Sequence, residues 1–224
     1  MRRPTRLGVM GGTFDHIHYG HLDAAEAART TLSLDEVWLL PSHDPPHREI
    51  DPLASPFHRF ALVALAVSGY ANLTASDLEL RRQGPSYTIA TLQELHQMGW
   101  LPAQIFFIIG ADALADIAAW RAFPDVLDAA HFAVVGRAGT TPDDVVTRVP
   151  AVAARLAPSG YQPQDERDTK VFAVAGRTRD ISSSLIRERL QQGSHVDDLV
   201  PAAVERHIMA NRLYGSVGPL HAEQ

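Results

Sequence analysis

The chain has 224 residues, of which 46% are hydrophobic, and a formal net charge of −6. This length and composition suffice for one domain with a substantial core. The negative charge argues against a general affinity for nucleic acid or anionic membranes, since both require a basic surface. The chain contains no cysteine, which excludes disulfides, thiolate metal sites and cysteine nucleophiles.

The apolar runs are also too short for targeting or membrane anchoring. The N-terminal stretch MRRPTRLGVMGG lacks the longer apolar core of a signal peptide. The most apolar helix candidate, Phe60 to Val67, is too short to span a bilayer. We therefore expect a soluble, cytoplasmic protein.

Strand-like and helix-like segments alternate along the chain. Most of the strand candidates are continuous apolar runs, as expected when both faces of a sheet are covered. They are Leu7–Met10, Val37–Leu40, Leu73–Ala75, Ile105–Ile109, Phe132–Val135 and Val171–Val174. Helices are predicted at Leu22–Thr31, Pro56–Val67, Thr88–Met98, Ala113–Ala119 and Pro142–Leu156.

This alternation predicts an α/β fold with a doubly wound parallel sheet and right-handed crossovers. The C-terminal part differs, because residues 181–214 read as two helices, Ser184–Gln192 and Pro201–Ala210. We expect one domain over residues 1–214, with 181–214 as a small helical subregion and 215–224 as a frayed tail.

Chemically distinctive residues follow five of the predicted strands. These stretches are GGTFDHIHYGH, PSHDPPHR, GADAL, GR and GRTRDISSSLIR. Ligands of doubly wound sheets bind at the carboxyl ends of the strands. The five loops are therefore expected to converge on one site.

The first loop has the features of a phosphate-binding turn. Gly11 and Gly12 allow a sharp turn and close approach of the backbone to a ligand. A helix beginning near Tyr19 or Gly20 would direct free N–H groups and its positive dipole end to the same place. The stretch is neither a Walker A loop nor G-x-G-x-x-G.

His18 and His21 lie three residues apart and would share a helix face. They can donate hydrogen bonds to phosphate oxygens. A metal site is the weaker interpretation, because no third ligand is evident. A pair of helix-capping histidines is the structural alternative.

The ISSSLIR stretch predicts a second helix N-terminus. One serine would suffice as a cap, so the remaining hydroxyls of Ser182, Ser183 and Ser184 are available to hold phosphate. Arg187 lies about one turn into the helix and can neutralise developing charge by bidentate hydrogen bonding.

These two motifs together resemble the H-x-G-H nucleotidyltransferase superfamily, which transfers a nucleoside monophosphate from a nucleoside triphosphate. The middle of the chain narrows the resemblance to bacterial nicotinate-nucleotide adenylyltransferases. The stretches that carry it are PPHR, RRQGPSYT, GADAL, Trp120 and DDLVP. The resemblance runs from residue 7 to about residue 214 and implies a Rossmann-like nucleotidyltransferase fold.

The chain departs from the family pattern at two positions. His16 stands where the family usually has proline after F-D, and Ser184 stands where it usually has threonine. Proline fixes φ, so His16 is expected to loosen the loop. Ser184 keeps a hydroxyl, and we assign His16 no catalytic task.

The resemblance implies adenylyl transfer from ATP to nicotinate mononucleotide, giving deamido-NAD and pyrophosphate. Mg²⁺ would arrive with the triphosphate, without a protein cage. The implied partners are these small molecules, with no nucleic acid or membrane; the sequence does not indicate an oligomeric state.

The resemblance also implies roles for individual residues. The catalytic set is His18, His21 and Arg187. ATP or its phosphates would contact Gly11, Gly12, Thr13, Phe14, Asp112, Ser182 and Ser183. The mononucleotide would contact Thr88 and Trp120, with Arg137, His47 and Arg48 as weaker candidates. Capping is the alternative for Thr88 and Asp112, and core packing the alternative for Trp120.

Two rival functions stay open on the sequence alone. A sibling enzyme could prefer nicotinamide mononucleotide, because amide and carboxylate differ by a few hydrogen-bond donors. Phosphopantetheine adenylyltransferases and cytidylyltransferases share the phosphate machinery but not the RRQGPSYT stretch or the base pocket. A non-catalytic nucleotide sensor on the same fold is the rival from another class.

Overall fold

The computed structural model describes residues 5–46, 52–136, 149–158, 161, 165–176 and 178–216. Three of the predicted mononucleotide contacts, His47, Arg48 and Arg137, lie outside the described residues, as do residues 142–148 of the predicted helix Pro142–Leu156.

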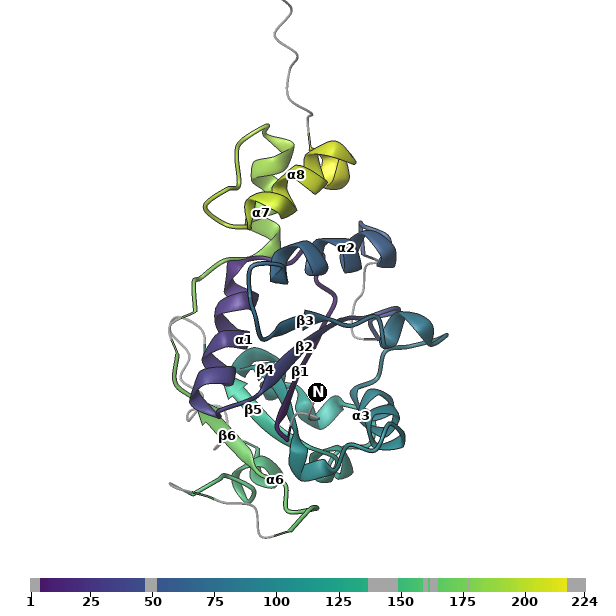
Figure 1. Ribbon diagram of the computed structural model, residues 1–224, viewed down its shortest axis with the longest axis vertical. Coiled ribbons are helices and arrows are strands. Elements are labelled where there is room, and N and C mark those ends of the chain that lie inside the picture. Colours follow the sequence, from purple (N-terminus) through teal and green to yellow (C-terminus); the bar gives the residue numbers. More distant parts are fainter. Residues whose placement is uncertain are drawn as a thin grey trace, which may run out of the picture.

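A single parallel sheet of six strands forms the centre of the molecule (Figure 1). Its order is β3-β2-β1-β4-β5-β6, and every neighbouring pair is parallel. The strands are β1 (Leu7–Gly12), β2 (Glu36–Pro41), β3 (Leu73–Ala75), β4 (Ile105–Gly110), β5 (His131–Val135) and β6 (Val171–Val174). The order reverses between β1 and β4, so the predicted doubly wound fold is confirmed.

Seven α-helices are described. They are α1 (Tyr19–Thr31), α2 (Pro56–Val67), α3 (Thr88–Gln97), α4 (Ala111–Ala115), α6 (Pro150–Ala153), α7 (Ser183–Gln191) and α8 (Ala202–Ala210). Short 3₁₀ helices are η1 (Glu79–Arg81), η2 (Pro102–Gln104), η3 (Ile117–Ala119), η4 (Asp125–Asp128) and η5 (Leu213–Gly215).

The continuous apolar strands serve both faces of the sheet, because successive side chains point in opposite directions. In β4, Phe106 and Ile108 pack in one core with α1, α2, α7 and α8. Ile105, Phe107 and Ile109 pack in a second core with α3, α4 and η4. The two cores explain why β4 has no polar alternation.

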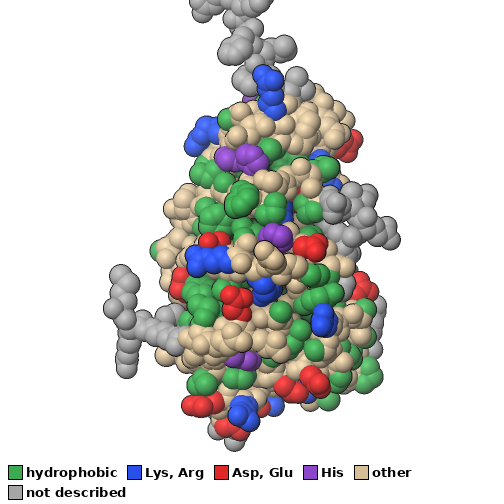
Figure 2. Space-filling view, turned by 90° about the vertical axis from the view of Figure 1, so that its right-hand side faces the viewer, with side chains coloured by type: hydrophobic (Ala, Val, Ile, Leu, Met, Phe, Trp, Pro, Cys, Tyr) green, Lys and Arg blue, Asp and Glu red, His purple; other side chains and the backbone are tan. Residues whose placement is uncertain are grey.

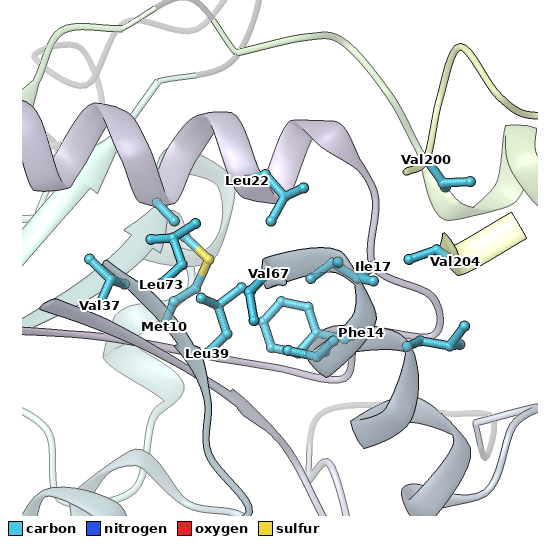
Figure 3. Packing of buried hydrophobic residues seen from close by; sticks show 14 of the residues in the cluster. Met10, Phe14, Ile17, Leu22, Val37, Leu39, Val67, Leu73, Val200 and Val204 are labelled. Atoms are coloured by element: carbon cyan, nitrogen blue, oxygen red, sulfur yellow. The ribbon is translucent and has the colours of Figure 1, made fainter. Parts of the chain in front are cut away.

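The C-terminal helices extend the first core. Figure 1 shows α7 and α8 at one end of the molecule, beyond α2. Val200 and Val204 lie in the same buried cluster as Phe14 and Ile17 of the loop after β1 (Figure 3). The Tyr19 N–H also donates to the Leu199 carbonyl over 3.0 Å. The helical subregion therefore packs against the start of α1.

One predicted helix has a different form. The segment Ala113–Ala119 is divided into α4 and the 3₁₀ helix η3, with Asp116 between them at φ −98° and ψ 7°. Leu114 and Ile117 are both buried. A 3₁₀ helix has three residues per turn. The change from α-helix to 3₁₀ helix therefore keeps the Leu114 and Ile117 side chains on the same side of the segment, toward the core.

None of the described helices is both long and apolar enough to cross a membrane. The face shown in Figure 2 carries acidic, basic and hydrophobic side chains interspersed. No large area of that face has charge of one sign.

Candidate active site

A cleft of about 430 Å³ lies at the carboxyl edge of the sheet. Each of the five loops singled out in the sequence supplies lining residues. They are Gly11 to Phe14 at and after the end of β1, Ser42, Pro45 and Pro46 after β2, Gly110 at the end of β4 and Asp112 after it, Gly136 after β5 and Thr178 after β6. The expected convergence of these loops is confirmed.

The two histidines lie together at the start of α1. His18 is the N-cap residue and His21 occupies the third helical position. Their rings stack with centroids 3.8 Å apart, and the His18 N–H donates to His21 Nδ1 over 3.3 Å. His18 is 2% exposed, whereas His21 is half-buried. Both rings border the cleft.

Two glycines make room for this arrangement. A Cβ on Gly20 would lie 3.0 Å from the Arg179 carbonyl and 3.1 Å from His18 Nδ1. A Cβ on Gly12 would lie 3.2 Å from the Phe14 ring, which itself packs edge-on to His21 at 5.1 Å. We call Gly12, Phe14, His18, Gly20 and His21 the histidine cluster.

The loop between β1 and α1 is held by α7. Arg187 Nη1 donates to the Asp15 carbonyl over 2.9 Å, and the Ser183 hydroxyl donates to the His16 carbonyl over 3.3 Å. Ser182 caps α7, accepting from the Leu185 N–H over 3.2 Å. Ser182, Ser183 and Arg187 are not among the described residues that line the cleft. Of the three, Ser183 and Arg187 contact the backbone of the loop.

A buried arginine also holds this loop. Arg59 of α2 is 0% exposed and donates to the carbonyls of Thr13, His43 and Ala54, over 2.7, 3.3 and 3.2 Å. Sequence reasoning missed it. The available signal was an arginine on the face of α2 that also carries the buried Leu62, Val63 and Ala66, because a charged group at such a position requires several polar partners.

His16 is buried rather than exposed in a loosened loop. Its side chain is 0% exposed, its Nδ1 lies 3.2 Å from the Ile17 carbonyl oxygen, and its ring packs edge-on to Tyr214 at 5.0 Å. Burial lowers the pKa of His16 to about 4. The expectation that His16 loosens the loop is therefore wrong, because the C-terminal segment covers the imidazole.

The other side of the cleft is aromatic. Trp120 is half-buried and packs edge-on to Phe107 with centroids 6.2 Å apart. Thr88 is the first residue of α3, and Tyr87 is the N-cap, so Thr88 is not the capping residue. Thr88, Phe107 and Trp120 all line the cleft.

Asp112 lies in the first turn of α4 and is exposed at the cleft. The N-cap is Gly110 rather than Asp112. A Cβ on Gly110 would collide with Asp112 Oδ1. The glycine therefore allows the carboxylate to fold back over the end of β4.

A buried carboxylate that sequence reasoning missed also lines the cleft. Glu79 is 5% exposed and accepts from the Thr91 hydroxyl over 2.6 Å. Burial raises the pKa of Glu79, and hydrogen bonds from Thr91 and Ser86 and the charge of Arg82 oppose that rise. We call Glu79, Ser86, Thr88, Phe107 and Trp120 the tryptophan cluster. The signal for Glu79 was its proximity to the RRQGPSYT stretch.

The described residues include no group of three or more histidine and acidic side chains arranged to hold a metal ion. Of the described carboxylates, Glu79 and Asp112 are those that line the cleft. Asp112 is the exposed one and can reach a ligand or a metal ion carried by it.

The fold and the cleft define a nucleotide-binding α/β protein of the nucleotidyltransferase type. The profile of the cytidylyltransferase-like family matches residues 9–189. A relative from Geotalea daltonii is 38% identical over 215 residues, covering 93% of this chain and 98% of its own. One from a Roseiflexus species is 39% identical over 208 residues, with 93% and 97% covered. Both are named probable nicotinate-nucleotide adenylyltransferases.

The chain therefore belongs to the cytidylyltransferase-like family and, within it, to the nicotinate-nucleotide adenylyltransferases. Solved structures agree in fold. The nicotinic acid mononucleotide adenylyltransferase of Plasmodium falciparum, in complexes with APC and with NaAD, matches with a TM-score of 0.67 for each complex. Identity is 16% and 15%, and 95% of this chain and 98% of that one are covered.

Proposed function

We propose that this protein transfers the adenylyl group of ATP to nicotinate mononucleotide, releasing deamido-NAD and pyrophosphate. The observation that carries the proposal is one cleft lined by both the stacked His18–His21 pair and the Thr88–Trp120 side. The names of the relatives that cover nearly the whole chain support the same reaction.

The reaction needs no covalent enzyme intermediate. An oxygen of the mononucleotide phosphate attacks the α-phosphorus of ATP, a P–O bond forms, and the bond to the β-phosphate oxygen breaks. The attacking phosphate is anionic at neutral pH, so no general base is required. Catalysis then consists of positioning and charge stabilisation.

In this proposal the histidine cluster contacts the donor phosphates. His18 and His21 donate hydrogen bonds to the α-phosphate and the departing pyrophosphate, and the Gly11 to Phe14 backbone supplies N–H groups. Ser182, Ser183 and Arg187 assist at the β- and γ-phosphates. The contacts of Ser183 and Arg187 to the Asp15–His16 backbone support a location of the α7 N-terminus beside that loop.

The tryptophan cluster receives the acceptor. The Trp120 indole offers a face for stacking a pyridine ring, and free N–H groups at the start of α3 can receive the nicotinate carboxylate. Asp112 accepts hydrogen bonds from ribose hydroxyls, for which its exposed position at the cleft is suitable. Arg137, His47 and Arg48 remain proposed contacts outside the described residues.

Nucleotidyltransferases generally use a divalent metal ion with ATP. We propose that the ion is Mg²⁺, carried as part of the substrate, because magnesium keeps several waters and binds through phosphate oxygens. We also propose that the chain acts in the cytoplasm as a single domain on small molecules alone.

A pyrophosphate-release assay tests the proposal. Purified protein with ATP and Mg²⁺ is offered nicotinate mononucleotide, nicotinamide mononucleotide or phosphopantetheine in parallel. We expect release with nicotinate mononucleotide at the highest kcat/KM. A clear preference for the amide would overturn the acceptor assignment, and release with none of them would favour a nucleotide sensor.

A further inference from the structure

Glu79 is a buried carboxylate on the cleft wall to which the proposed chemistry gives no task. It begins η1, while its oxygens face the start of α3. An ionisable group with a raised pKa inside a cleft is a frequent mark of a functional site. The contacts of Glu79 show which part of the chain it positions.

The Thr91 hydroxyl donates to this carboxylate over 2.6 Å. Thr91 lies one turn into α3, and Ser86, two positions before the first residue of that helix, lines the same cleft as Glu79. Glu79 thus holds the first turn of the helix that Thr88 begins.

The same contacts continue in two directions. Ser86 Oγ accepts from the His43 N–H over 2.9 Å, and the Ser86 N–H donates to the Asp44 carbonyl over 2.8 Å. On the other side, Arg82 donates to Thr91 Oγ1 over 3.1 Å and pairs with Glu94 at 3.0 Å. Glu79 and Arg82 therefore both hold Thr91 of α3, while Ser86 joins the segment before that helix to the loop after β2.

We propose that Glu79 is the positioning residue for the acceptor, an inference that rests on the proposed function. Glu79 fixes the N-terminus of α3. It thereby places Thr88 and the backbone N–H groups that bind the nicotinate carboxylate. Loss of the hydrogen bond from Thr91 frees the start of α3, which weakens acceptor binding. The histidine cluster is joined to this network indirectly, through Arg59 and the His43 backbone, so ATP binding is expected to change much less.

Steady-state kinetics of the full-length protein, with each substrate varied in turn, test this role. We expect Glu79→Ala to raise KM for nicotinate mononucleotide by about tenfold or more, the equivalent of one or two lost hydrogen bonds, and to leave KM for ATP within about twofold. Glu79→Gln keeps the shape and a carbonyl acceptor for Thr91, so it should restore acceptor KM to near the wild-type value.

Two further variants separate positioning from direct contact. Thr91 is 0% exposed and is absent from the described cleft lining, so Thr91→Val removes a donor to Glu79 without touching substrate. We expect it to raise acceptor KM in the same direction as Glu79→Ala. Gln97→Ala, which truncates an exposed side chain at the C-terminal end of the same helix, is the matched control and should change neither KM.

The outcomes are distinct. If the wild type is inactive with nicotinate mononucleotide, both the proposed function and this inference fail. If the wild type is active and Glu79→Ala leaves acceptor KM unchanged, or raises the two KM values equally, this inference alone fails. If Glu79→Ala does not fold, an unchanged acceptor KM in Thr91→Val overturns the inference by itself.

Discussion

The two clusters that line the cleft are assembled in different ways. The histidine cluster comes from one contiguous stretch, residues 12–21, in which glycines and rings fit one another locally. The tryptophan cluster comes from η1, the start of α3, β4 and the residue after η3. A cluster formed by one contiguous stretch can be recognised from a sequence motif. A cluster formed by distant segments can be recognised only once the fold shows that these segments are neighbours.

Arg59 links the two clusters, so its removal should have the largest effect. It donates to the Thr13 carbonyl beside the histidine cluster and to the carbonyl of His43, whose N–H contacts Ser86. Arg59→Met leaves three carbonyls without the donor that the buried guanidinium supplies, and we expect a loss of about 4 kcal/mol in unfolding free energy. Urea denaturation at neutral pH measures it.

The matched control for Arg59→Met is Arg81→Met. Arg81 is the last residue of η1, its side chain is exposed, and it pairs with Asp77. Exposed ion pairs contribute little to stability, so the unfolding free energy of this variant should lie within about 0.5 kcal/mol of the wild-type value. A loss in Arg59→Met no larger than that of the control would contradict the linking role.

Breaking the histidine cluster alone should affect turnover. We expect His18→Ala to lower kcat about 100-fold, because it removes a donor from the proposed site of charge development, while KM for the acceptor stays near wild type. His195→Ala is the control, since its side chain is 91% exposed. Single-turnover pyrophosphate release is the direct measurement, and an unimpaired His18→Ala rate would refute the phosphate contact.

Breaking the tryptophan cluster alone should affect acceptor binding. Trp120→Ala removes the stacking face, and we expect KM for nicotinate mononucleotide to rise about tenfold with kcat changed far less. Trp120→Phe keeps an aromatic face and should recover most of the loss. If Trp120 serves packing alone, both variants should lower the melting temperature with no selective change in acceptor KM.

The smallest expected effect involves neither cluster directly. His131 is 0% exposed, and burial lowers its pKa to about 4. Between that value and the ordinary histidine pKa the unfolded chain binds more protons, so stability falls as pH falls. From pH 7.5 to 5.5 we expect a loss of about 1 kcal/mol from this group.

His131→Phe removes the titration while keeping an aromatic ring beside Phe106 and Phe172. The difference between the unfolding free energies at pH 7.5 and 5.5 should be smaller in this variant than in wild type, whatever its absolute stability. Equal differences would show that His131 does not contribute to acid sensitivity.

The sheet could be predicted from the sequence because each strand has a local signal. The apolar runs at β1 to β6, together with the helical and turn segments between them, are sufficient to predict a parallel, doubly wound sheet. The site was predicted in part for the same reason: the histidine cluster, Thr88 and Trp120 lie in recognisable stretches. All of them line one cleft.

The rest depends on contacts between distant segments. Glu79 becomes an acceptor only when η1 packs against α3, and Arg59 only when α2 closes over two loops. Ser183 and Arg187 contact the Asp15–His16 backbone, and spacing along the chain does not predict this contact between α7 and the loop after β1. Their contacts to phosphate stay a prediction.

The position of His16 beneath Tyr214 has a consequence for synthesis. The β1–α1 loop leaves the ribosome before Arg187 and Tyr214, which contact it. A nascent chain that ends before α7 contains all six strands and still lacks these two contacts. The sheet can therefore be synthesised in full before the loop gains its support from α7 and η5.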